Sequence, residues 1–211
     1  MAFDTWLMFV VVAALAILSP GPAILLAITN GSRGGLRAVA LSSLGNILGV
    51  AAVAGVSVFG LGALLQTSAL LFLVVKLIGA AYLVYLGIKQ LRRAAVSLSQ
   101  AAAVDGPVQR PAAGLFREGA LVALTNPKAI AFFTALFPVF LDTGRPLALQ
   151  FGLMTATFMA LSFMSLLAYG ALARSAGRWL AEPRRQRAFN RVTGGVFIGL
   201  GASLLSLGRG T

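Results

Sequence analysis

Lys128 is the charged residue that lies deepest inside an apolar segment of this sequence. No other charged residue occurs between Glu118 and Asp142. If this segment crosses a bilayer, a charge near its centre costs at least about 2.5–3.5 kcal/mol, so it should face an aqueous path or a partner within the protein. On an aqueous path, the ammonium group would meet a substrate carboxylate. The alternative is structural, with the ammonium bound to carbonyl groups at the end of a broken helix.

Two proline motifs predict broken helices. Pro20-Gly21-Pro22 lies inside the first apolar segment, and Asn126-Pro127 lies inside the fourth. Each proline removes a backbone donor and clashes with the preceding turn. The freed carbonyl groups must be satisfied by protein or water, so such breaks are placed where the backbone lines a cavity. A plain kink explains either break alone, whereas the pair in corresponding positions favours the substrate site of a transporter.

The two halves of the chain share a short repeat. Leu18–Ile24 aligns without a gap with Leu124–Ile130, half the chain further on. Three apolar segments per half is an odd number, which inverts the second half relative to the first in the membrane. We therefore expect a first three-helix repeat at 1–92, a cytoplasmic linker at 93–116 and a second three-helix repeat at 117–211.

The composition places these motifs in a membrane protein. Of the 211 residues, 59% are hydrophobic and 10% are charged, whereas soluble domains average roughly 45–50% apolar and about 25% charged residues. A helix needs about 20 apolar residues to cross a bilayer. The sequence therefore predicts an all-α polytopic membrane protein with six transmembrane helices, of which helices 1 and 4 are broken. The expected spans are 5–28, 39–62, 69–89, 117–140, 147–171 and 189–208.

The basic residues predict the orientation of these spans. The net charge is +12, from 17 Lys and Arg against 5 Asp and Glu, and most of the basic residues fall in the first, third and fifth loops. Because cytoplasmic loops carry the excess of Lys and Arg, we expect these loops in the cytoplasm and both termini on the outer side. The same distribution indicates contact with the lipid bilayer rather than with nucleic acid.

The acidic residues restrict what the membrane site binds. The sequence has no His or Cys, and its acids fall in loops or at span ends, so we expect neither a metal site nor a cofactor. A zwitterion fits better, with its carboxylate facing Lys128 and the half-helix N-termini. Its ammonium would face unwound carbonyl groups and the side-chain oxygens of Asn46 and Asn126. For Asn46, an interhelical hydrogen bond is the equal alternative. Lys76 is an accessory candidate, although it is also close enough to the outer face to extend its amine to water.

Pairs of glycines spaced four residues apart predict close helix packing. Gly45 and Gly49 form one such pair, and Gly195 and Gly199 form another. Small residues at this spacing most often let two helix backbones approach each other. The contact is expected within the bundle or across the interface of a homodimer.

Several of these motifs occur together in a known family. They are Ser19-Pro20-Gly21-Pro22, Gly31 and Gly35, Gly45 and Gly49, Lys76–Leu83 with Leu86-Gly87, Leu124–Lys128, Ala135–Pro138 and Phe189–Gly201. On these residues the sequence resembles the lysine-exporter (LysE/RhtB) family of bacterial amino-acid exporters, most closely its homoserine/threonine efflux branch. The resemblance covers essentially the whole chain. It implies an exporter in the bacterial inner membrane that is driven by the proton gradient.

The chain departs from the family pattern at two points. Members often carry Asp or Asn directly after the PGP motif, where this chain has Ala23, and some have a His in span two, where this chain is apolar. Any proton coupling would therefore fall to Lys128, to a bound water or to Glu118 at the span edge. Ala23 also leaves room for a more hydrophobic substrate.

These observations predict a secondary transporter, not an enzyme, that exports neutral amino acids such as homoserine, threonine or similar small or branched ones, by proton antiport. The expected site residues are Pro20, Gly21, Pro22, Asn46, Asn126, Pro127 and Lys128, with Lys76 and Glu118 as accessory residues. The alternative is an exporter of a non-amino-acid metabolite or drug on the same fold. An intramembrane enzyme has few candidate groups, for example Ser162 or Lys128.

Overall fold

The structure is a computed structural model that describes residues 1–19, 21–67, 69–92, 110–142, 144–173 and 182–206. These residues form helices and no strands. The α-helices are α1 (Phe3–Leu18), α2 (Pro22–Thr67), α3 (Ala69–Arg92), α5 (Ala112–Leu124), α6 (Pro127–Ala131), α7 (Leu147–Ala171) and α9 (Pro183–Ser206). A π-helix, η1 (Phe132–Leu136), and a 3-10 helix, η2 (Phe137–Phe140), follow α6.

The described helices include segments that suit a bilayer by length and composition. Pro22–Ser57 of α2 and the whole of α7 are long and apolar enough to cross a membrane. The bent pair formed by Ala112–Leu124 and Pro127–Phe140 is a third such segment if its two parts, which meet at 49°, count as one span. The predicted all-helical fold with apolar membrane-spanning helices is thus confirmed for the described residues.

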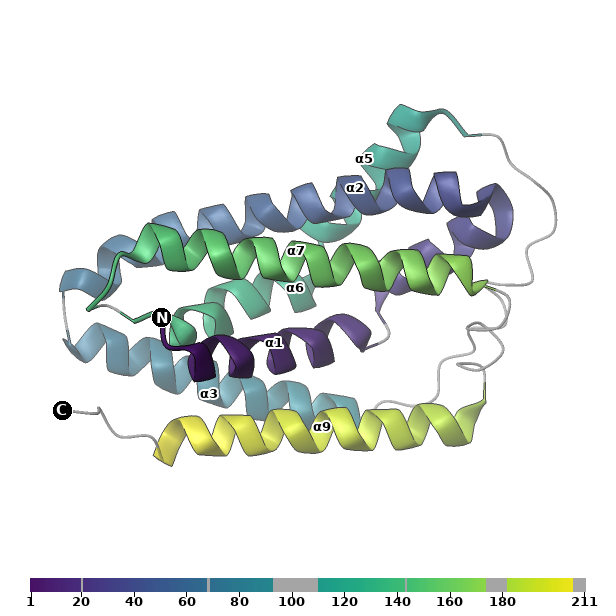
Figure 1. The fold of residues 1–211 in the computed structure, drawn as a ribbon. Helices are drawn as coiled ribbons and strands as arrows, with labels where there is room; N and C mark the ends of the chain where they lie inside the picture. Colours follow the sequence, from purple (N-terminus) through teal and green to yellow (C-terminus); the bar gives the residue numbers. More distant parts are fainter. Residues whose placement is uncertain (20, 68, 93–109, 143, 174–181, 207–211) are drawn as a thin grey trace.

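The long helices lie side by side along one direction (Figure 1). α2 packs against α5 and α7, and α3 packs against α9. One end of the bundle, which we call the basic end, holds the bend of α2, the first turn of α5 and the start of α9 (Figure 1). It carries Arg33, Arg37, Arg110, Arg117, Arg184, Arg185 and Arg187. The N-terminus of the chain and the last turn of α9 lie at the opposite end (Figure 1).

The helix is interrupted at both predicted places. α1 ends at Leu18 and α2 begins at Pro22, while α5 ends at Leu124 and α6 begins at Pro127. In each case the new helix starts on the proline, whose missing N–H is no loss at the first helical position. α5 also starts inside the segment expected to be a linker, because Pro111 serves as its N-cap.

The first loop, expected between spans 5–28 and 39–62, is reduced to a kink at Gly35 that joins two helical segments of α2. α2 continues through this region, and its only non-helical residue is Gly35, with φ 66° and ψ −167°. This positive φ is a conformation that glycine adopts at little cost. The helix continues past the predicted end at residue 28, and there Gly31 packs directly against the backbone of Gly170 in α7.

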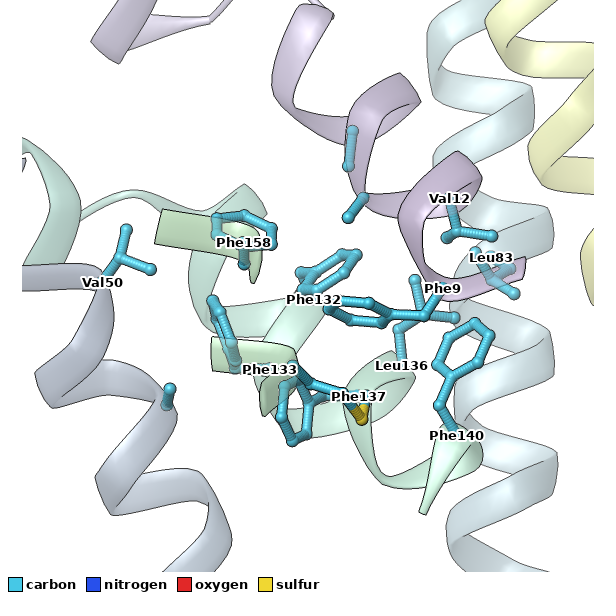
Figure 2. Packing of buried hydrophobic residues seen from close by; sticks show 14 of the residues in the cluster. Phe9, Val12, Val50, Leu83, Phe132, Phe133, Leu136, Phe137, Phe140 and Phe158 are labelled. Carbon is cyan, nitrogen blue, oxygen red and sulfur yellow. The ribbon is translucent and has the colours of Figure 1, made fainter. Parts of the chain in front are cut away.

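Phenylalanines form the core next to the second break (Figure 2). Phe9 of α1 is fully buried and meets the rings of Phe137 and Phe140 edge to face, with centroids 5.8 and 5.5 Å away. Phe133 packs on Phe158 of α7 in the same way, at 4.9 Å. This cluster holds η1 and η2 against α1 and α7, so the second half of the broken span is fixed by packing.

The first glycine pair is used for close packing, as predicted. A side chain at Gly45 would collide with the backbone of Phe116, and one at Gly49 would lie 2.8 Å from the carbonyl of Ala120, both in α5. The second pair differs, because a side chain at Gly195 or Gly199 would meet nothing among the described residues. These two glycines face away from the bundle, so their use within the bundle is wrong and a homodimer contact stays a prediction.

Candidate functional site

A small cavity between α1, α2, α6 and α7 brings the predicted polar residues together. Its volume is about 40 Å³, enough for only a few water molecules. Gly21, Asn46, Asn126 and Lys128 all line it. The remaining walls are formed by Ala16, Ile17, Ala23, Ile24, Val50, Ala129, Phe132, Phe158, Ser162 and Leu166.

The first break leaves carbonyl groups that side chains of the second half satisfy. In a continuous helix, the carbonyl of Leu18 would accept from the N–H of residue 22, which is Pro22 and has none. Tyr169 of α7 donates its hydroxyl to this carbonyl instead, at 3.2 Å. The next carbonyl, of Ser19, accepts from Lys128 Nζ at 2.8 Å. The structural alternative considered for Lys128 is therefore realised.

Lys128 also belongs to the cavity wall. A side chain at Gly21 would approach Lys128 Nζ to 3.4 Å, so the glycine of the PGP motif leaves the space that the ammonium occupies. The amine thus bridges the first break and the cavity. Capping the helix and binding a substrate are compatible, because an ammonium group has three donors.

The second break is capped by residues of its own segment. The Asn126 side chain accepts a hydrogen bond from Lys128 N at 3.0 Å and is the N-cap of α6. In a continuous helix the carbonyl of Ala123 would accept from the N–H of residue 127, but Pro127 has none. The N–H of Asn126 donates to this carbonyl instead, at 3.2 Å. Asn126 Nδ2 forms no hydrogen bond with the described residues and is available to a ligand in the cavity.

Asn46 makes the interhelical hydrogen bond that was one of its two expected roles, and its substrate contact stays a prediction. Its Nδ2 donates to the carbonyl of Gly119 in α5 at 3.4 Å, an interhelical contact, and its side chain is buried. It also lines the cavity. The described residues offer no hydrogen-bond partner to its Oδ1, so this oxygen can accept from a substrate.

Ser162, Phe132 and Phe158 are site residues that the sequence analysis missed as such. Ser162 of α7 is buried, lines the cavity, and its hydroxyl forms no hydrogen bond within the described part of the chain. Hydroxyl side chains are common in apolar spans, so the sequence offers no reason to place Ser162 in a binding site, and it is considered there only as a candidate nucleophile. Phe132 and Phe158 stack at 4.9 Å and close the cavity toward the aromatic core (Figure 2).

Three of the expected site residues, Pro22, Pro127 and Glu118, do not line this cavity. Pro22 and Pro127 are the exposed first residues of α2 and α6. Glu118 lies on α5 near the basic end, where it pairs with Arg110 at 2.8 Å. Lys76 belongs to α3, and its side chain is outside the described residues, as is the whole of Pro20.

The site is cationic on one side and neutral elsewhere. Lys128 is its charged residue, and no acidic residue of the described ranges lines the cavity. The N-terminus of α2 at Gly21 adds partial positive charge. Such an arrangement suits a carboxylate near Lys128 and a small, partly apolar side chain near the phenylalanines.

Sequence comparisons identify relatives of the chain. The profile of the LysE type translocator family matches residues 14–208. The chain is 35% identical over 205 residues to an uncharacterized membrane protein of Vibrio cholerae, covering 97% of this chain and 98% of that protein. It is 33% identical over 207 residues to the homoserine/homoserine lactone efflux proteins of Salmonella typhi and Salmonella typhimurium, covering 98% of each chain. No solved structure matches.

The match spans both breaks and every described residue of the cavity. The family is one of transporters rather than enzymes, and its proteins are multi-pass membrane proteins of bacteria. The chain belongs to the LysE-type translocator family.

Proposed function

We propose that this chain is a secondary transporter that exports neutral amino acids, such as homoserine, threonine or similar small or branched ones, from the cytoplasm by proton antiport. The observation that carries the proposal is the meeting of Gly21, Asn46, Asn126 and Lys128 around one cavity. Two relatives that match over their full length are named homoserine/homoserine lactone efflux proteins, which supports the substrate class.

The substrate is held by both of its charged groups. Its carboxylate binds Lys128 Nζ and the N-terminus of α2, where a charge-assisted hydrogen bond is strong. Its ammonium binds Asn46 Oδ1, and its side chain lies between Phe132, Phe158 and the Ser162 hydroxyl. At about 40 Å³ the cavity is too small for an amino acid in this conformation, so transport requires its walls to separate and close again.

The architecture that we propose is six spans arranged as a 3+3 inverted repeat. The first repeat is 1–92, the second is 117–211, and 93–116 connects them. Support comes from the two interrupted helices, which lie in corresponding positions of the halves. The basic end faces the cytoplasm of the bacterial inner membrane, because Arg residues gather there.

Lys128 is the group through which we propose that protons are coupled. It is the titratable residue of the described cavity wall, whereas Glu118 is occupied by Arg110.

The test is uptake of labelled amino acids into everted membrane vesicles, with and without an imposed proton gradient. We expect gradient-dependent uptake of homoserine or threonine by the native chain. Lys128→Ala should reduce uptake by about 10- to 100-fold, because a charge-assisted hydrogen bond is lost. The matched control is Lys89→Ala, which removes an exposed lysine of α3. Full activity of Lys128→Ala would falsify the site assignment.

A non-amino-acid metabolite or drug is the second candidate substrate. The cavity wall favours it in one respect, because most of its side chains are apolar, Ala23 among them. Cells that express the native chain or Lys128→Ala are compared for resistance to toxic amino-acid analogues and to hydrophobic drugs. Resistance to drugs alone, retained in Lys128→Ala, supports this second candidate and contradicts the first.

A further inference from the structure

A second, larger cavity lies at the basic end and is separate from the cavity at the breaks. Its volume is about 710 Å³, and it is bounded by α2 at its bend and by the start of α5. Three arginines from two separate segments line it: Arg33, Arg37 and Arg110. None of its lining residues is shared with the smaller cavity.

The bend at Gly35 creates this space. The positive φ of Gly35 turns the backbone of α2 between Arg33 and Arg37, which are one helical turn apart in sequence. A side chain built at Gly35 would meet nothing within 4 Å. The bend therefore holds two guanidinium groups around an opening that a straight helix would not leave.

The cavity has an excess of positive charge. Arg110 is paired with Glu118 at 2.8 Å, but neither Arg33 nor Arg37 has an acidic partner among the described residues. Arg33 Nε is buried without a hydrogen-bond partner, which is costly for a charged group. α5 also begins here with no acidic residue in its first turn and no side-chain cap, so its free N–H groups add positive potential.

The inner part of the cavity is apolar. Ala38, Leu41 and Leu115 line it together with the arginines, and the neighbouring Leu36 is exposed on the outside of the helix. A ligand that fits must therefore be anionic at one end and apolar at the other. A phospholipid has this character, and its phosphate lies at the depth of a helix end in the bilayer.

We propose that this cavity binds an anionic phospholipid, with the phosphate held by Arg33 and Arg37 and the acyl part against Leu41 and Leu115. A guanidinium group binds two phosphate oxygens at once, and the buried Arg33 Nε gains the acceptor that it lacks among the described residues. Because the cavity is formed by α2 of the first half and by the end of the connecting segment at the start of α5, the bound lipid links these two parts of the chain. The site is independent of the amino acid transported.

The test measures lipid retention by the purified full-length chain in native mass spectrometry. Phosphatidylglycerol, phosphatidylcholine and inorganic phosphate are offered separately to the native chain, to Arg33→Gln/Arg37→Gln and to Arg184→Gln/Arg187→Gln. The last variant is the matched control, since it removes the same charge from exposed residues at the same end. We expect preferential retention of phosphatidylglycerol, weakened about 25-fold in the first variant and unchanged in the control.

Equal loss in both double variants shows a diffuse surface effect and overturns the proposal. Binding of inorganic phosphate without retention of phosphatidylglycerol overturns the lipid assignment in favour of a free phosphate. Should the double variant fail to fold, Arg37→Gln alone serves, because Arg37 is exposed and contributes little to packing. Lipid retention by Arg37→Gln equal to that of the native chain also contradicts the proposal.

Discussion

At the scale of single residues, the first break depends on two donors from distant parts of the chain. Lys128 Nζ and the Tyr169 hydroxyl bind consecutive carbonyl groups at the end of α1. Both donors are more than 100 residues away in sequence from the PGP motif whose prolines leave these carbonyl groups without a helical partner. Lys128 was recognisable in the sequence because a charge in an apolar segment is conspicuous, whereas Tyr169 was not, since tyrosines are frequent in membrane helices.

Replacing Tyr169 by Phe removes one of these donors without removing the ring. We expect the free energy of unfolding to fall by about 1–3 kcal/mol, because the Leu18 carbonyl loses its hydrogen bond in an apolar setting. Thermal unfolding in detergent measures the change. Tyr85→Phe is the control, since Tyr85 of α3 is 52% exposed. Equal stability of both variants contradicts the role given to Tyr169.

Ser162 is expected to discriminate between substrates by their hydroxyl groups. Its own hydroxyl is buried against the cavity and unpartnered among the described residues. Ser162→Ala should weaken competition by homoserine or threonine by about tenfold and leave that of valine nearly unchanged, since a hydrogen bond in a buried site is lost only for the former. Competition assays in vesicles test this, and equal effects on all substrates refute a hydroxyl contact.

At the scale of elements, the structure shows how a long helix is both bent and tightly packed. The spans expected from the sequence, 5–28 and 39–62, left residues 29–38 as a loop, but within α2 only Gly35 leaves the helical conformation. Which glycine bends the helix is decided by packing, because Gly31 is pressed against α7 whereas Gly35 is open. The π-helix η1 was not predictable either, since the aromatic packing that surrounds it is tertiary (Figure 2).

Gly45 is expected to tolerate no side chain. A methyl group there would collide with the backbone of Phe116 in α5, and overpacking of this kind costs about 1–3 kcal/mol or more. Gly45→Ala should therefore lower the yield of folded protein and its unfolding temperature. The matched control is Gly55→Ala in the same helix, where the added methyl group meets nothing. A stable Gly45→Ala variant would show that α2 and α5 pack differently.

At the scale of the whole molecule, arginines gather at one end of the helix bundle. The bend of α2, the first turn of α5 and the start of α9 share one end, and the N-terminus lies at the other (Figure 1). The all-helical, apolar character of the chain and the clustering of arginines followed from hydropathy and loop composition, which are local properties. The apolar part of the cavity wall did not, because it combines residues from α1, α2, α6, η1 and α7.

Because the sequence has no Cys, single introduced cysteines report orientation without background. We expect Arg184→Cys to react with a membrane-impermeant thiol reagent only in everted vesicles, and Gly144→Cys only in intact cells. Both residues are exposed in the structure. Arg184 belongs to the first turn of α9 and Gly144 to the turn before α7, and the starts of these two helices lie at opposite ends of the bundle (Figure 1). The reverse pattern would show that the basic end faces outward.

The two breaks differ in when they can be completed. Asn126 and Thr125 cap the second break with groups of its own segment, so this break is satisfied as soon as it is made. The carbonyl groups of the first break are satisfied later, because their donors lie 109 and 151 residues further along the chain. During synthesis on the ribosome, the end of α1 is therefore exposed until α6 and then α7 have been inserted. A chain stopped before Tyr169 should be a preferred target of membrane quality-control proteases.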